Sequence, residues 1–102
     1  MDGIVRIDKV VAVLEVWLDA TFFPFAKMKV KVLERSHDFL AVANLAYRDP
    51  VSGVPEYTSG LGDNAEEAVN DLLLRFVSEI REYSPSTELT ESHFEWSAHE
   101  DF

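Results

Sequence analysis

The segment from Gly60 to Val69, GLGDNAEEAV, constrains the fold of this chain more than any other. It has the pattern of a strand end, a tight glycine turn and the capped start of a long helix. The Asn64 side chain is placed to accept a hydrogen bond from the Glu67 amide while the Glu67 carboxylate accepts one in return, as in a capping box. The sequence therefore predicts a strand that turns directly into a helix.

That helix is predicted to run from about Ala65 to Tyr83, and Ser84-Pro85-Ser86 is expected to end it. Each large apolar side chain that it buries is worth about 1.5–3 kcal/mol, so we expect it to be the main stabiliser of the domain. Leu74 lies outside the apolar stripe, which makes it a candidate for a dimer contact or a tail-binding groove. The stripe itself recurs at helical spacing and consists of Ala65, Ala68, Val69, Leu72, Leu73, Phe76, Val77, Ile80 and Tyr83.

The chain has 102 residues, a formal net charge of −10 and no cysteine. Its length suits one domain, which we place at residues 1–83, and residues 84–102 form a tail with five acidic and no basic side chains. Excess negative charge repels phosphate, so a basic protein is favoured as a partner over nucleic acid. The lack of cysteine excludes disulfides and thiolate metal sites.

The apolar run from Val10 to Leu18 is interrupted by Glu15 and is too short to span a bilayer. No small-residue cleavage pattern follows it, so the sequence does not predict a signal peptide. We therefore expect a cytoplasmic protein that makes no contact with a membrane.

Residues 8–21 fit two interpretations. Asp8 is a suitable N-cap, and Ala12 and the acidic residues fall on one helical stripe opposite an apolar one. Four valines within seven positions favour a strand instead. A strand would need burial on both faces, because Glu15 shares its parity with apolar residues such as Trp17. The pattern favours a helix, and the strand stays an open alternative.

Residues 25–48 predict two antiparallel strands. Lysines alternate with apolar residues over 25–34, with the period of two that a half-buried strand shows. A turn at 35–38, a partner strand from Phe39 to Arg48 and a short third strand from Pro55 to Ser59 follow. The predicted fold class is therefore α+β in the order α-β-β-β-α, a three-stranded antiparallel meander with two helices packed on one face and an acidic C-terminal tail.

The run from Met28 to Glu82, and above all GLGDNAEEA at residues 60–68, resembles the HicB antitoxin family. In that family a β-meander ends in a Gly-Asp-Thr-like turn, followed by a Glu-Glu-Ala helix start. The resemblance implies a protein that binds and neutralises a small RNA-cleaving toxin. The DNA-binding segment common in that family has no counterpart in this sequence, and the predicted leading helix is not part of the family's pattern.

With the leading helix, the order of elements resembles the double-stranded-RNA-binding domain. Gly60 and Gly62 match the Gly-x-Gly turn of that family. The lysines that contact phosphate there are replaced here by Ala65, Glu66 and Val69. The resemblance implies the topology, while the negative charge at the helix start disfavours the RNA-binding role.

Two surfaces are candidates for partner binding. In the tail, acidic residues alternate with large apolar ones, and we expect partner contacts at Glu91, Phe94, Glu95, Trp96, Glu100, Asp101 and Phe102. The alternative is that these aromatic side chains fold back onto the domain. The second surface is the strip of Lys27, Lys29 and Lys31, which either binds an acidic or phosphate group or protects an edge strand from aggregation.

The sequence shows no catalytic pattern. His93, Glu95 and His99 lack the spacing of zinc ligands, and the turn at 60–62 lacks the lysine of a phosphate-binding loop. We therefore predict no catalytic residue, metal or cofactor. The predicted function is a non-enzymatic, antitoxin-like module that inhibits or regulates a basic, nucleic-acid-handling protein. The alternatives are a nucleic-acid-binding domain that uses the lysine strip and an enzyme whose site forms only in an oligomer, and a homodimer stays open.

Overall fold

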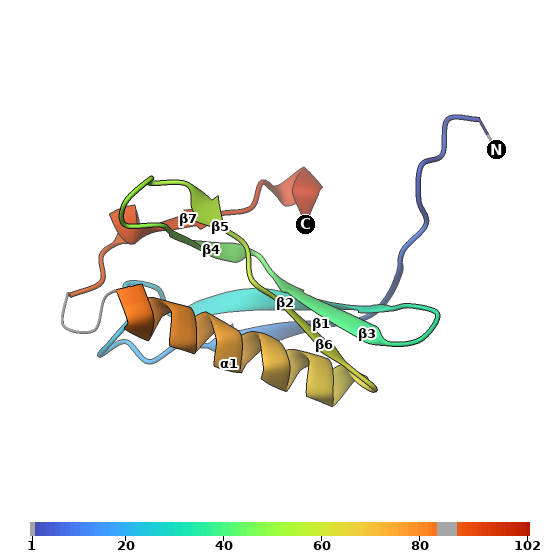
Figure 1. The fold of residues 1–102 in the computed structure, drawn as a ribbon, viewed down its shortest axis with the longest axis horizontal. Coiled ribbons are helices and arrows are strands. Elements are labelled where there is room, and N and C mark those ends of the chain that lie inside the picture. The colour runs from blue at the N-terminus through green and yellow to red at the C-terminus, as the bar shows by residue number, and fades with distance from the viewer. Residues whose placement is uncertain (1, 84–87) are drawn as a thin grey trace.

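The computed structural model describes residues 2–83 and 88–102 and shows an α+β fold with antiparallel sheets and one α-helix (Figure 1). The larger sheet has four strands in the order β1 (Lys9–Trp17), β2 (Lys27–Glu34), β3 (Phe39–Ala43) and β6 (Ser59–Gly62). The smaller sheet has three strands in the order β5 (Pro55–Glu56), β4 (Leu45–Arg48) and β7 (Phe94–Trp96). The helix α1 (Ala65–Tyr83) precedes two short 3-10 helices, η1 (Glu91–His93) and η2 (His99–Asp101).

The predicted helix over residues 8–21 is wrong, because this segment contains the edge strand β1. β1 pairs antiparallel with β2 along its length, with a bulge between Val10 and Ala12. The expected burial on both faces is absent, because both faces of this edge strand are largely exposed. Within β1 only Ala12 and Val16 are partly buried against the core. The preference of β-branched side chains for extended backbone therefore outweighs the helical stripe.

The predicted three-stranded meander is only partly present. β2 and β3 form the expected hairpin across the turn at residues 35–38. The predicted partner strand divides at Asn44 into β3 and β4, which belong to different sheets. The predicted third strand also divides, because Pro55 and Glu56 form β5 and the chain enters the larger sheet only at β6.

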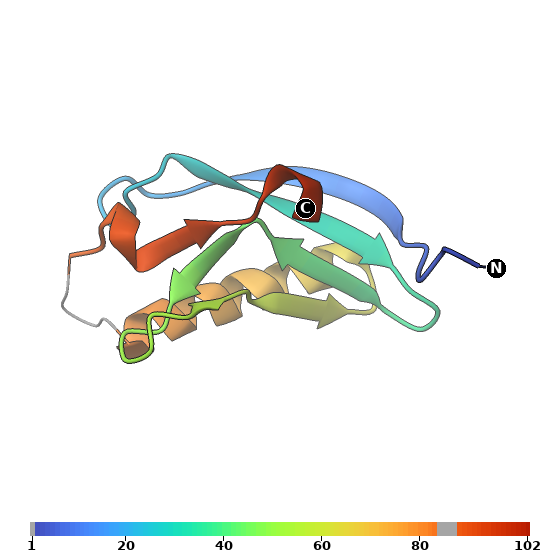
Figure 2. The ribbon, with the colours of Figure 1, turned by 90° about the horizontal axis from the view of Figure 1, so that it is seen from above.

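α1 packs on one face of the larger sheet, over β6, β3 and β2 (Figures 1 and 2). Glycine permits this approach, since a Cβ at Gly60 would lie 2.3 Å from the Ala68 carbonyl oxygen. The predicted cap is present: the Glu67 amide donates to Asn64 Oδ1 at 2.9 Å, and the Glu67 carboxylate accepts the Asp63 amide rather than the Asn64 amide. Within the ranges 2–83 and 88–102, no helix has the length and apolar character that crossing a membrane requires. The buried core consists of Met28, Val30, Val32, Ala41, Ala43, Leu45, Tyr47, Ala68, Leu72, Phe76, Ile80 and Phe94.

The C-terminal segment from residue 88 packs into the fold and is not a free tail. β7 pairs antiparallel with β4, and Phe94, which lies opposite Tyr47, is 4% exposed. The Phe94 ring also packs on Phe23 and Phe25, at centroid distances of 6.2 and 5.6 Å. The alternative in which the aromatic side chains fold back is therefore confirmed for Phe94. The predicted helix stop at 84–86 and the predicted boundary at residue 84 lie outside the described residues.

Candidate protein-binding surfaces

The C-terminal candidate residues do not form one aromatic binding surface. Phe94 is buried, Trp96 packs edge-on against Phe25 with ring centroids 4.9 Å apart, and Glu95 forms an ion pair with Arg48 at 2.9 Å. The aromatic side chains of Phe94 and Trp96 thus contact other parts of the fold. Trp96 stays 40% exposed, and the acidic candidates that are exposed and form no ion pair with other described residues are Glu91, Glu100 and Asp101.

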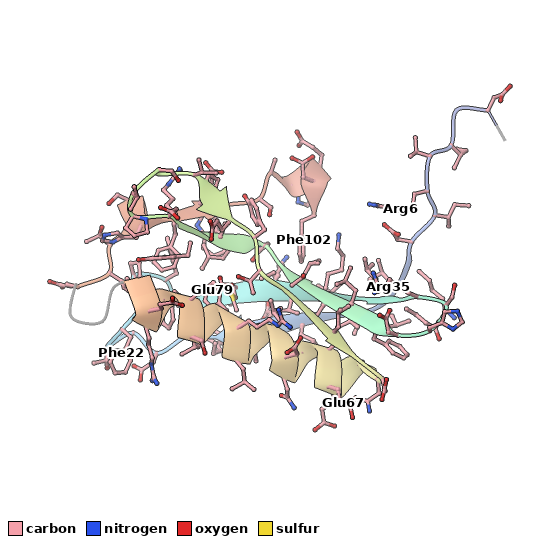
Figure 3. The ribbon with its side chains drawn as sticks, in the orientation of Figure 1. Arg6, Phe22, Arg35, Glu67, Glu79 and Phe102 are labelled. Atoms are coloured by element: carbon pink, nitrogen blue, oxygen red, sulfur yellow. The ribbon has the colours of Figure 1, made fainter. Side chains whose placement is uncertain are left out.

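Phe102 lies against Lys31 of β2. Lys31 Nζ lies 4.7 Å from the Phe102 ring centroid and also donates a hydrogen bond to the Phe102 carbonyl. Such a contact between a cation and a ring face is worth about 0.5–1 kcal/mol at an exposed site. Figure 3 shows Phe102 near η2, far along the molecule from Phe22. Lys31 and Phe102 therefore engage each other, and neither presents its full surface to a partner.

The lysine strip lies on one face of β2, opposite Glu15 and Trp17 of β1. Lys27 Nζ pairs with Glu15 Oε1 at 3.1 Å and lies 5.1 Å from the Trp17 ring centroid. β2 is an interior strand of its sheet, so the interpretation that these lysines protect a sheet edge is wrong. Of the three ammonium groups, that of Lys29 has no partner within the part of the chain that the structure describes.

Ion pairs engage most of the basic side chains. With Lys31 bound to Phe102, Lys29 and Arg81 are the two of the nine basic side chains that remain without a partner among the described residues. Six of the nineteen acidic side chains form ion pairs, and the other thirteen outnumber these two cations, so the surface that a partner meets is negative. The ion pairs between described residues are Arg6–Asp8, Lys9–Glu34, Lys27–Glu15, Arg35–Asp38, Arg48–Glu95 and Arg75–Asp71.

Hydrogen bonds hold some of the aspartates in their charged form. The backbone amide of Leu61, which donates to the Asp71 carboxylate at 2.9 Å, lowers the pKa of Asp71, and the Arg75 guanidinium lowers it further. Bonds of 2.5 and 2.6 Å from the Arg35 guanidinium lower the pKa of Asp38. These carboxylates therefore keep their negative charge at a lower pH than free aspartate does.

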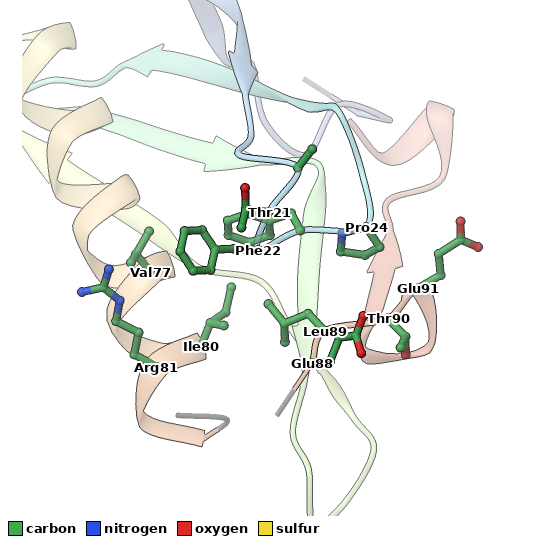
Figure 4. A pocket seen from close by; sticks show the side chains of 12 residues that line it. Thr21, Phe22, Pro24, Val77, Ile80, Arg81, Glu88, Leu89, Thr90 and Glu91 are labelled. Atoms are coloured by element: carbon green, nitrogen blue, oxygen red, sulfur yellow. The ribbon is translucent and has the colours of Figure 1, made fainter. Parts of the chain in front are cut away.

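A cavity of about 720 Å³ lies between the segment 20–24, the last turns of α1 and the segment 88–91 (Figure 4). We did not predict this cavity from the sequence. We call this the Phe22 cavity, because the ring of Phe22, which is 64% exposed, lies at its side and is open to solvent. The run Phe22-Phe23-Pro24 in a connecting segment was the available signal. The apolar lining consists of Phe22, Phe23, Pro24, Val77, Ile80 and Leu89.

Charged side chains surround the Phe22 cavity. Glu88 and Glu91 line it from the segment after α1, are exposed, and form no ion pair with other described residues. Arg81 lines it from α1, and Figure 4 shows its guanidinium turned away from Leu89. An apolar pocket beside two carboxylates suits an apolar side chain that is flanked by cations.

The polar side chains at the Phe22 cavity carry hydroxyl, carboxylate and guanidinium groups. Its hydroxyl groups come from Thr21 and Thr90, and no histidine or lysine is among the described residues that line it. In the described ranges, no cluster of three or more His, Cys, Asp or Glu side chains is placed to hold a metal ion. No buried side-chain polar atom of the described residues lacks a hydrogen-bond partner.

No protein-family model, curated protein or solved structure matches this chain. Its function must be argued from its own residues. The resemblances to the HicB antitoxins and to the double-stranded-RNA-binding domain stay predictions.

Proposed function

We propose that this chain is a non-enzymatic, acidic protein-binding module that holds a basic partner protein at the Phe22 cavity. The observation that carries the proposal is an open apolar cavity beside unpaired carboxylates in a protein of net charge −10. The apolar lining anchors the partner, and the charge selects which partner approaches.

The lining supports an anchor side chain from the partner. Ile80 projects from α1, Leu89 from the segment after it, and Phe22 from the loop before β2, so three segments converge (Figure 4). Burying one leucine- or phenylalanine-sized side chain there is worth about 1.5–3 kcal/mol. Because a few such side chains supply most of the affinity of an interface, one anchor in this cavity is enough to position the partner.

The carboxylates support a positively charged partner. Glu88 and Glu91 stand beside the anchor site, and the net negative charge of the chain accelerates association with a cationic protein. A protein that normally handles nucleic acid presents such a cationic surface. The carboxylates of Glu88 and Glu91 compete with phosphates for it, so binding inhibits or regulates the partner, as the HicB-like resemblance implies.

Nucleic-acid binding through the lysine strip is the second candidate. The observation in its favour is that Lys27, Lys29 and Lys31 share one face of β2. Lys27 and Lys31 already have partners, which leaves the Lys29 ammonium to attract phosphate. Against ten excess negative charges this attraction is weak, so we rank this function second.

Capture experiments with tagged protein test the first proposal. We expect the wild-type chain to retain a basic protein at low salt and to release it at high salt. Phe22→Asp removes the exposed ring and should abolish this capture. Leu61→Asp, at a residue of β6 that is 48% exposed and outside the cavity lining, is the matched control. Equal capture by Phe22→Asp and wild type, or an eluate that contains nucleic acid and no basic protein, contradicts the proposal.

A further inference from the structure

We propose that two copies of this chain associate through their β1 strands, antiparallel and related by a two-fold axis, to form one continuous sheet. This inference does not depend on the Phe22 cavity. It rests on the open edge of β1, on the symmetry of the pairing that this strand allows, and on the apolar arm at residues 2–8.

β1 is an open edge, because β2 pairs with it on one side only. α1 lies over β2, β3 and β6 and leaves β1 uncovered (Figure 2). Val10, Val13, Leu14 and Trp17 are consequently 48, 57, 40 and 69% exposed. The unpaired backbone donors and acceptors of such an edge are a template for another strand.

The opposite edge of the sheet is protected and β1 is not. β6 is short and packs against α1, and its Leu61 amide is bonded to the Asp71 carboxylate at 2.9 Å. β1 has nine residues and no proline, and its one acidic side chain, Glu15, is paired with Lys27. The prolines and unpaired charges with which monomeric proteins prevent edge pairing are therefore missing from the centre of β1.

The sequence of β1 is compatible with pairing to itself. Beyond the bulge, its pairing with β2 is regular from Ala12 onward. A two-fold axis at Leu14 sets Leu14 against its own copy, Ala12 against Val16 and Val13 against Glu15. An axis at Glu15 would oppose two carboxylates, which is unfavourable. An axis at Val13 would set the bulge residue Val11 against Glu15, two positions from the centre, whereas the axis at Leu14 moves Val11 to the end of the pairing, opposite Trp17. Leu14 is therefore the centre that a symmetric, closed contact selects.

The arm before β1 adds apolar surface to the same contact. Ile4, Val5 and Ile7 are 53, 102 and 84% exposed, and the arm extends away from the rest of the chain (Figures 1 and 2). In an antiparallel pair, the start of each β1 lies beside the end of the other. With the axis at Leu14, Val11 of each copy lies opposite Trp17 of the other, so each arm begins beyond Trp17 and brings exposed apolar side chains within reach of the other copy.

Cysteine crosslinking tests both the pairing and the position of the axis, because the chain has no native cysteine. Directly opposite residues of antiparallel strands have Cβ atoms about 4.5–5.5 Å apart, close to disulfide range. We expect Leu14→Cys to form a covalent dimer on mild oxidation. Val13→Cys and Val16→Cys should crosslink less, since the axis places each opposite a different residue. Val51→Cys, at a residue before β5 that is 96% exposed, is the control and should stay a single chain.

The mass in solution is the second test. By light scattering we expect the wild type to have the mass of two chains and Leu14→Lys the mass of one. The control Val51→Lys should again have the mass of two. Far-ultraviolet circular dichroism identifies any variant that fails to fold. A single-chain mass for the wild type at every concentration overturns the proposal. An open-ended series of oligomers also overturns it, because that series indicates β1 pairing with β6 of the next copy.

Discussion

Asn44 and Lys29 exchange two hydrogen bonds: the Lys29 amide donates to Asn44 Oδ1 at 2.8 Å, and the Asn44 amide donates to the Lys29 carbonyl at 3.0 Å. The Asn44 carbonyl accepts a third bond, from the Ser97 amide, at 2.8 Å. Asn44 thus ties β2 to the segment after β7 at the point where the chain leaves β3 and enters β4. The passage from one sheet to the other is held by these bonds.

Asn44→Leu should lower the free energy of unfolding by about 0.5–1.5 kcal/mol, because the Lys29 amide loses its acceptor while the backbone bonds of residue 44 remain. Urea denaturation measures this change. Asn70→Leu, at an exposed position of α1, is the control and should leave the midpoint almost unchanged. Equal effects of the two substitutions would show that the side chain of Asn44 does not support the crossing between sheets.

Gly60→Ala should destabilise the protein by about 1–3 kcal/mol, since overpacking a close contact forces the backbone to shift. The added Cβ would lie 2.3 Å from both the Ala68 carbonyl oxygen and the Leu72 amide nitrogen. Thermal unfolding followed by circular dichroism checks the prediction. Ser59→Ala, one residue earlier and exposed, should be nearly neutral. A wild-type midpoint for Gly60→Ala would mean that α1 does not pack this closely.

Asn64→Ala should cost about 0.5–2 kcal/mol, because the Glu67 amide loses the side-chain acceptor at the start of α1. The loss should appear as a lower urea midpoint with an unchanged slope, since the folded state keeps its compactness. Asn64→Ser, which preserves a capping oxygen, should recover most of the stability. If Asn64→Ser is as unstable as Asn64→Ala, the cap is not the cause.

The parts of the fold that could be predicted are those specified by residues close together in the sequence. Asn64, Glu67 and Gly60 lie within a few residues of each other and specify the strand-to-helix junction without help from distant segments. The alternation of lysines and apolar residues likewise specifies β2. The prediction for residues 8–21 was wrong because an exposed edge strand has no alternation of buried and exposed positions. The chance helical stripe at Asp8, Ala12 and Glu15 was therefore misleading.

The remaining features arise from contacts between distant segments. The division at Asn44 depends on Lys29 and Ser97, and β7 finds β4 across more than forty intervening residues. The Phe22 cavity needs three separate segments to converge. The sequence left open whether the tail aromatics fold back, because their partners, such as Tyr47 for Phe94, cannot be identified from local sequence.

Asp71→Asn should reduce the dependence of stability on acid pH. The Leu61 amide and then the Arg75 guanidinium lower the pKa of Asp71 in the folded state, so the folded carboxylate binds a proton more weakly than the unfolded one. Its contribution to stability is present above the unfolded pKa of about 3.9 and is lost as the pH falls through the lower folded pKa. Urea midpoints measured from neutral to acid pH should therefore fall less in Asp71→Asn than in the wild type. Asp2→Asn, in the exposed arm, is the control, and parallel curves for all three proteins would contradict this role of Asp71.

A photo-crosslinking phenylalanine derivative at position 22 identifies directly what binds at the Phe22 cavity. The ring is exposed and lines the cavity, so the replacement preserves its shape and brings the reactive group against whatever occupies the site. The same derivative at Tyr57, which is 49% exposed and outside the lining of the Phe22 cavity, is the matched control. We expect irradiation to attach a basic protein at position 22 and not at position 57. Equal labelling from both positions, or attachment of nucleic acid or an acidic protein at position 22, would contradict it.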